Sequence, residues 1–285
     1  AAALVHAAMD AAAENGRQGD VDALGVLLDV YGHDDLVMST ALATLGGAGV
    51  VRLLTEIGQG RASRDSALQV ATQVRSALAG VSTAWSRERA EAFAADMFDG
   101  LGATSAWNPA ASVVGFLFAD HDADRIGQEL TVAVADQLDR YERRSTWFSQ
   151  GGTWTNGVGR GLWAFAGGEN PGARVHDPAG RVLETLGRYP DAALDWLTDS
   201  GADDVGGTEE ELGEARAQYW FGERDWSADR TGDGFEGPGA LWAGAQQAPG
   251  SLLAPTGAEA DTAVQRQVAN LSTDLFEHLA GNESF

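Results

Sequence analysis

The chain has 285 residues, with 42 Asp and Glu against 19 Lys and Arg, and a formal charge of −23 at pH 7. Every basic residue is an arginine, because the sequence contains no lysine, and it contains no cysteine. These absences exclude a Walker or Schiff-base lysine, disulfides, thiolate zinc sites, iron–sulfur clusters and thiol nucleophiles. The acidic balance also disfavours nucleic acid as a partner, because phosphate backbones bind through Lys and Arg.

Membrane and export signals are weak. No stretch reads as both long and apolar enough for a membrane span, and the best candidate, residues 103–119, contains Asn108 and Pro109. Residues 1–6 lack a basic region followed by an apolar one, so no cleavable signal peptide is expected. We therefore expect no membrane insertion, and either a cytoplasmic protein or one exported without a cleavable signal.

Apolar residues recur at helical spacing along most of the chain. In residues 122–145, one apolar stripe has members three or four residues apart: Ile126, Leu130, Val134, Leu138 and Tyr141. Further helices are expected over residues 2–14, 20–31, 34–45, 47–57, 64–79, 86–101, 109–119, 178–187, 190–199, 208–219, 238–247 and 258–280. Glycines at nearly all joints are typical of helix ends, and no run alternates as a strand would. The sequence predicts an all-α protein.

The other face of residues 122–145 carries charge. Asp136 precedes Arg140, and Asp139 precedes Arg143, by four residues. Such acid-before-base pairs stabilise a solvated helix by about 0.2–0.5 kcal/mol each. We expect this face to be the outer one.

Several short blocks recur in the same order, which indicates an internal duplication. The blocks are Leu42–Gly46 with Leu183–Gly187, Ala67–Ala71 with Ala240–Gly244, and Asp96–Leu101 with Asp274–Leu279. The sequence predicts two related helical units, residues 1–145 and 146–285, packed as one body. The second unit carries an acidic, Gly/Asp-rich insertion near 200–237. Similarity from shared alanine-rich composition is the alternative.

Tryptophans concentrate in the second unit and its Gly/Trp-rich loops, which we expect to be ordered. Six of them form two similar clusters: Trp147, Trp154, Trp163, Trp220, Trp226 and Trp242. Exposed tryptophans anchor protein interfaces or stack sugars, and buried ones close a core. We predict that these six residues contribute to a protein-interaction surface, with core packing as the main alternative.

Metal and catalytic motifs are sparse. Asp225, Asp229, Asp233 and Glu236 lie in a Gly-rich segment that resembles the first half of a calcium-binding EF-hand loop. Ala240 stands where the bidentate acid belongs, so a solvated acidic loop is the alternative and no cofactor is expected.

Two further motifs are weak. The cluster at residues 120–124 (Asp-His-Asp-Ala-Asp) fits either an acid–base site or a capped helix start. Residues 157–161 (Gly-Val-Gly-Arg-Gly) deviate from the dinucleotide-binding fingerprint and fit a turn.

The repeated blocks, Leu-x-x-Leu-Gly, Ala-Leu-x-x-Ala and Asp-[Met/Leu]-Phe-[Asp/Glu]-x-Leu, resemble those of uncharacterised helical proteins of high-GC Gram-positive bacteria. Such proteins accompany WXG-type helical-hairpin substrates of type VII secretion and polymorphic toxin systems. The resemblance covers about a third of the chain. It implies a carrier or scaffold role and brings no catalytic residues.

These observations favour a non-catalytic protein-interaction, scaffold or carrier module that binds other proteins and forms homo- or hetero-oligomers. A carboxylate-dependent hydrolase and a subunit of a larger assembly are the alternatives. An enzyme would need convergent carboxylates in a pocket.

Overall fold

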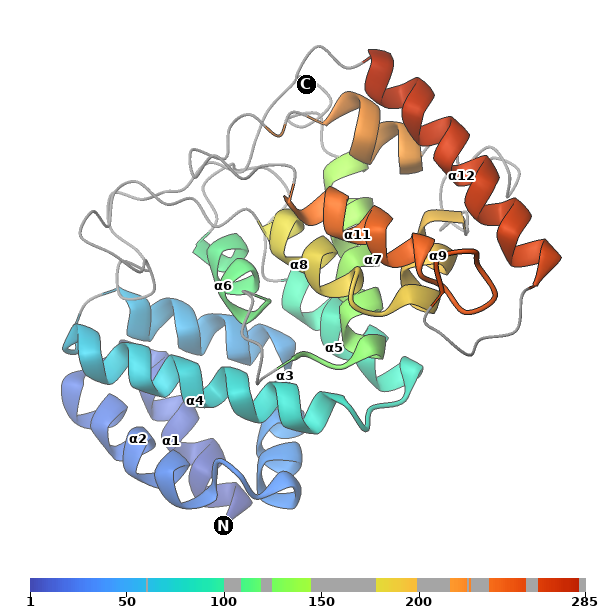
Figure 1. The fold of residues 1–285 in the computed structure, drawn as a ribbon. Coiled ribbons are helices and arrows are strands. Elements are labelled where there is room, and N and C mark those ends of the chain that lie inside the picture. Colours follow the sequence, from blue (N-terminus) through green and yellow to red (C-terminus); the bar gives the residue numbers. More distant parts are fainter. Residues whose placement is uncertain are drawn as a thin grey trace.

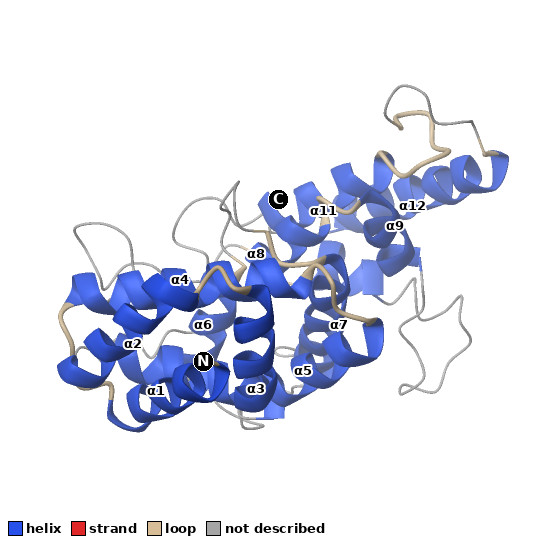
Figure 2. Ribbon diagram, turned by 90° about the horizontal axis from the view of Figure 1, so that it is seen from below, coloured by secondary structure: helices blue, strands red, loops and turns tan. Residues whose placement is uncertain are grey.

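The computed structural model describes residues 1–59, 61–99, 109–118, 125–144, 178–198, 216–224, 226, 236–254 and 261–281. Within these ranges every regular element is a helix, which confirms the all-α class (Figure 2). Buried side chains from the N- and C-terminal halves form one continuous cluster. The predicted residues 147, 154 and 163, the acids at 225, 229 and 233, and residues 120–124 and 157–161 lie outside the described ranges.

Figure 1 shows the arrangement of the helices. The N-terminal half contains α1 (Ala2–Asn15), α2 (Gln18–Tyr31), α3 (Asp35–Gly58), α4 (Arg64–Ser82), α5 (Arg87–Asp99), α6 (Pro109–Leu117) and α7 (Gln128–Arg144). The C-terminal half contains α8 (Pro178–Leu186), α9 (Pro190–Thr198), the π-helix η2 (Gln218–Glu223), α11 (Glu236–Gln246) and α12 (Thr262–Gly281).

Helix starts and ends follow the predicted signals closely. Asp34 caps α3 by accepting from the backbone N–H groups of residues 36 and 37, and Ser63 caps α4 by accepting from that of residue 66. Gly16 ends α1 in the left-handed conformation that favours glycine. Two expectations differ from the structure: α7 begins at Gln128 rather than near residue 122, and the helix expected to end at residue 219 continues to Glu223 as a π-helix.

The helix α3 breaks where the sequence predicts a joint. Gly46 adopts φ 73° and ψ 174°, and α3 continues as a second helical segment. Asp96 of α5 accepts a hydrogen bond from the backbone N–H of Ala48 at 2.9 Å, and so caps that second segment from another helix. A Cβ on Gly46 would meet the same carboxylate, so this position requires glycine for two reasons.

The same helix corrects the membrane prediction. By length and composition alone, α3 is the one described helix that could cross a membrane. The sequence predicts two short helices here, and although α3 does break at Gly46, its two segments together form one apolar element of 24 residues. In the structure α3 packs against α1, α4, α5 and α6.

Two helices of the C-terminal half, α8 and α11, pack against each other at close range. A Cβ on Gly187, which directly follows α8, would collide with the backbone of residue 240 in α11, and one on Gly244 would collide with the backbone of Gly187. A second contact, between Gly237 and Gly180, lies seven residues earlier in both segments. The two helices therefore run parallel, held together by glycines spaced two turns apart.

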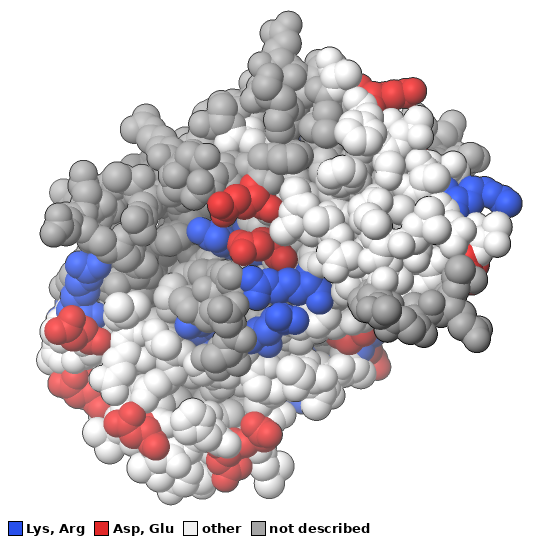
Figure 3. Space-filling view, in the orientation of Figure 1, with Lys and Arg blue, Asp and Glu red and all other residues white. Residues whose placement is uncertain are grey.

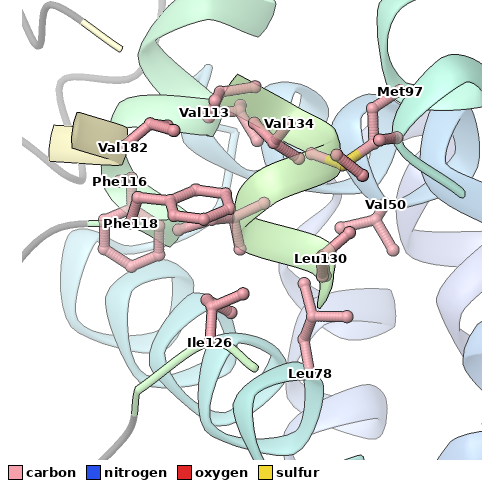
Figure 4. Packing of buried hydrophobic residues seen from close by; sticks show 14 of the residues in the cluster. Val50, Leu78, Met97, Val113, Phe116, Phe118, Ile126, Leu130, Val134 and Val182 are labelled. Atoms are coloured by element: carbon pink, nitrogen blue, oxygen red, sulfur yellow. The ribbon is translucent and has the colours of Figure 1, made fainter. Parts of the chain in front are cut away.

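The helix α7 lies at the centre of the core and joins the two halves. Its residues Leu130 and Val134 are fully buried. Figure 4 shows side chains of five other helices around them: Val50, Leu78, Met97, Val113, Phe116 and Val182. The apolar stripe predicted for this segment is therefore the core-facing one.

Candidate functional site

The second face of α7 carries three acids at intervals of three residues, namely Asp136, Asp139 and Glu142. Asp139 and Glu142 are fully buried, so the prediction that this face is exposed was wrong. The physical reason is that α9 and the segment that begins at Arg216 lie over it, and Arg216 and Arg224 supply the counter-charges. Figure 1 places α9 next to α7.

Asp139 has three donors at hydrogen-bonding distance. Its Oδ2 accepts from Arg143 Nη2 at 2.6 Å and from Arg216 Nε at 3.1 Å, and its Oδ1 accepts from Trp220 Nε1 at 2.8 Å. Two guanidinium groups and an indole N–H thus replace the water that a buried carboxylate loses.

Glu142 lies one turn further along α7. It binds the later part of the segment that begins at Arg216. Arg224 donates from Nε to Oε2 at 2.7 Å and from Nη2 to Oε1 at 3.1 Å. The Tyr219 hydroxyl donates to Oε2 at 2.7 Å. The two-pronged geometry suits a planar guanidinium, and a lysine would not reproduce it.

Arg216 is the most connected member of this network. Besides Asp139 it donates from Nη2 to Asp136 at 3.2 Å and from Nη1 to the backbone carbonyl of Trp196 at 2.7 Å. Its guanidinium also lies 4.3 Å from the centre of the Trp196 ring. Cation, carboxylates and aromatic face therefore fix α9 and the start of η2 onto α7.

Asp136 lies at the rim of the network, and Trp196 Nε1 donates to it at 2.9 Å. Burial raises the pKa of this carboxyl above its ordinary value, and the nearby Arg216 and the Trp196 hydrogen bond oppose the shift. Its ionised form is therefore less favoured in the folded protein than in water.

The tryptophans over this network correct the predicted interaction surface. Trp220 is fully buried and Trp226 nearly so. Trp226 Nε1 donates to the backbone carbonyl of Trp220 at 2.9 Å, and the Arg224 guanidinium lies 3.9 Å from the centre of the Trp226 ring. These two rings are core residues, as the alternative interpretation had it, because the segment that carries them folds back onto α7.

The remaining predicted residues are dispersed. Trp242 is partly buried and lies with its ring against the edge of Phe276 in α12. Glu236 is the exposed first residue of α11 and the only member of the predicted calcium site within the described ranges. In those ranges no three His, Asp or Glu side chains gather as a metal site would require.

The network described here balances three carboxylates, Asp136, Asp139 and Glu142, against three guanidinium groups, Arg143, Arg216 and Arg224. Such an arrangement positions helices, since each charge is held by fixed partners rather than offered to a substrate. We define these six residues as the α7 clamp.

A different feature lies on the surface, at the corner between α2 and the start of α3. Three aliphatic side chains there are largely exposed: Val26 at 64%, Val30 at 66% and Leu36 at 79%. Exposed acids lie among them in the sequence, at positions 22, 29, 34 and 35, and residues 18–51 contain no arginine. Figure 3 shows acidic side chains separated by uncharged surface in this part of the molecule. We call Val26, Val30, Leu36 and these four acids the acidic corner.

Comparisons with protein-family models, curated proteins and solved structures found no match to this chain. Its function therefore has to be argued from its own residues.

Proposed function

We propose that the chain is a non-catalytic protein-interaction module that binds a partner through the acidic corner. The observation that carries the proposal is the exposure of Val26, Val30 and Leu36 in a stretch, residues 18–51, whose only formal charges are negative. Isolated exposed aliphatic residues are ordinary on proteins. Here two of them lie four residues apart on one helix, and the third follows directly on the next.

The chemistry of this corner favours a basic amphipathic helix as the occupant. The Val26 and Val30 side chains are one turn apart and offer apolar contact to a partner helix with the same spacing. Asp22, Asp29 and Asp34 would attract Lys or Arg beside that contact and repel acidic partners. A net charge of −23 would also speed the approach of a basic partner at low salt.

The α7 clamp supports this proposal from the inside of the molecule. Its ion pairs hold α9 and η2 in one register on α7 and so fix these three helices relative to one another. The resemblance to secretion-associated helical proteins implies a carrier or scaffold role. A fixed arrangement of helices agrees with that role.

We also propose that the two halves are related units. What supports this is the parallel between Leu42–Gly46 and Leu183–Gly187. In both copies a helical segment with a buried leucine reaches a glycine, and a second helical segment follows. The two glycines differ in their contacts, since Gly46 faces Asp96 of α5 and Gly187 faces α11.

The experiment is a titration with a designed Leu/Lys amphipathic helical peptide, with a Leu/Glu peptide as the control ligand. The double variant Val26→Asp/Val30→Asp makes the corner more acidic and less apolar. If the apolar contact matters, affinity for the Leu/Lys peptide falls about tenfold despite the added negative charge. Tighter binding by the variant would show non-specific charge attraction and overturn the proposal.

A matched control is available on α11. Ala243 and Gln247 are exposed and also four residues apart. Ala243→Asp/Gln247→Asp adds the same charge at another place, so its affinity for the peptide should equal or slightly exceed that of the unmodified protein.

A further inference from the structure

The last helix, α12, presents an open face that is complementary to itself. Its inward side is fixed to the body by the buried Leu271 and Leu275 and by hydrogen bonds from Gln267 to Thr198 and from Gln246 to Ser272. Its outward side is a stripe of six exposed residues at intervals of three and four: Ala263, Arg266, Asn270, Thr273, Glu277 and Ala280. We call these six residues the α12 stripe.

Residues at equal distances on either side of the centre of this stripe are chemically complementary to one another. If two copies of α12 lie antiparallel about a two-fold axis level with residues 271 and 272, Arg266 of each faces Glu277 of the other. The same operation places Asn270 opposite Thr273 and Ala263 opposite Ala280. A cation thus meets an anion twice, an amide meets a hydroxyl twice, and the small alanine side chains meet at the two ends of the pair.

The surroundings of α12 fit the same arrangement. Residues 237–258 contain no charged residue, although the chain as a whole carries −23. Figure 3 shows a broad uncharged surface in the region of α11 and α12, with basic atoms toward one end and acidic atoms toward the other. A second copy would therefore meet no like charge from the described residues 237–254.

Exposed apolar side chains lie near both ends of α12. Leu252 and Leu253 are 83% and 64% exposed in the turn before α12, and Phe276 is 60% exposed near its other end. The turn is tied to the start of α12 by a hydrogen bond from Asp261 N to Gly250 O at 3.0 Å. In the antiparallel pair Phe276 of one copy lies level with Gln267 of the other, in the half of α12 that begins beside Leu252 and Leu253.

We propose that two copies of this chain associate through antiparallel, two-fold pairing of the α12 stripe. The interface is a single helix pair with its flanks, so we expect a dissociation constant on the order of micromolar. This contact is separate from the acidic corner and leaves that corner open to a partner in both copies.

The test is sedimentation velocity on the whole chain across a concentration series up to about 100 μM, at a salt concentration that screens long-range repulsion. In Arg266→Glu, an acid at position 266 of each copy faces Glu277 of the other copy. In Glu277→Arg, a cation at position 277 of each copy faces Arg266 of the other copy. Each should weaken the dimer about tenfold or more. The double variant Arg266→Glu/Glu277→Arg restores both pairs with reversed polarity and should recover dimerisation.

Net charge needs its own control. Glu88 is exposed on α5 and far from α12 in the chain. Arg266→Glu/Glu88→Arg has the same net charge as the swapped double variant but no restored pair, so it should stay monomeric. Far-ultraviolet circular dichroism on every variant establishes that the helices are intact.

Recovery in the swapped variant and not in the charge-matched control supports the proposed pairing. The proposal is overturned if the unmodified protein is monomeric throughout the series, if Arg266→Glu leaves the dimer unchanged, or if both double variants behave alike.

Discussion

Arg224 spans both carboxylate oxygens of Glu142, at 2.7 Å from Oε2 and 3.1 Å from Oε1, although 82 residues separate the two in the chain. Glu142 is fully buried and Arg224 nearly so. A pair of this kind contributes little net stability compared with an apolar contact, but the loss of one partner leaves a buried charge. The α7 clamp therefore determines the geometry with which the C-terminal half docks on α7, and it contributes less to the free energy of that docking.

Glu142→Gln tests this relationship. The amide keeps the shape of the side chain but removes the charge that compensates the buried Arg224 guanidinium. We expect the free energy of unfolding to fall by about 3 kcal/mol in urea titrations. The matched control is Glu91→Gln in the exposed pair with Arg87, where the change should stay within about 0.5 kcal/mol. Equal effects of the two substitutions would contradict the importance of burial.

Trp226→Ala tests the assignment of this ring to the core. The substitution removes a buried ring that covers Arg224 and bonds to the Trp220 carbonyl, so we expect a loss of about 3–5 kcal/mol. Trp242→Ala removes a partly buried ring and should cost about 1–2 kcal/mol. Thermal and urea unfolding measure both. An unchanged stability of the Trp226→Ala variant would contradict the assignment of this ring to the core.

The titration of Asp136 gives a pH dependence with a defined sign. Its pKa is raised in the folded protein, so the folded state holds this proton more tightly than the unfolded chain, whose value is about 3.9. As the pH falls from above the folded pKa toward about 3.9, this group adds stability. Asp136→Asn cannot titrate there. The stability of the unmodified protein minus that of the variant should therefore increase as the pH is lowered through this window.

Urea titrations of both proteins at several pH values between about 7 and 4 measure that difference. A difference that shrinks as the pH falls would mean that pairing with Arg216 outweighs burial and that the pKa is lowered instead.

Gly244→Ala tests the close crossing of α8 and α11. The added methyl group would collide with the Gly187 backbone, which cannot rotate away as a side chain would. We expect a loss of about 2 kcal/mol or more. Gly180→Ala is the control in the same helix pair, because its methyl group meets open space and alanine favours the helix; stability should stay constant or rise by up to about 1 kcal/mol. A neutral Gly244→Ala would show that the helices separate at little cost.

Local signals account for what the sequence predicts well. Asp34 and Ser63 cap α3 and α4 at the helix starts predicted near residues 34 and 64, and the predicted joint at Gly46 lies where the backbone leaves the helix. These features depend on residues within a few positions of one another. The apolar stripe of α7 is likewise local, because helical periodicity alone defines it.

The α7 clamp was missed because its partners are distant in the chain. Asp139 and Arg143 have the spacing of an exposed helical pair, and nothing nearby shows that Arg216 and Trp220 cover them. One signal was present: Arg216 and Arg224 flank the aromatic run Tyr219–Phe221. Three consecutive aromatic residues require burial, and arginines beside them then require buried acids.

The acidic corner is the proposed partner-binding surface. Site-specific photo-cross-linking in the source cell tests most directly whether a partner binds there. A photoreactive residue at position 30 should form an adduct with one protein, and mass spectrometry should place the linked segment in a basic amphipathic helix. The same residue at position 243, which is exposed on α11, should not capture that segment. Adducts at position 243 and none at position 30, or adducts at position 30 only with acidic or unstructured segments, would contradict the proposal.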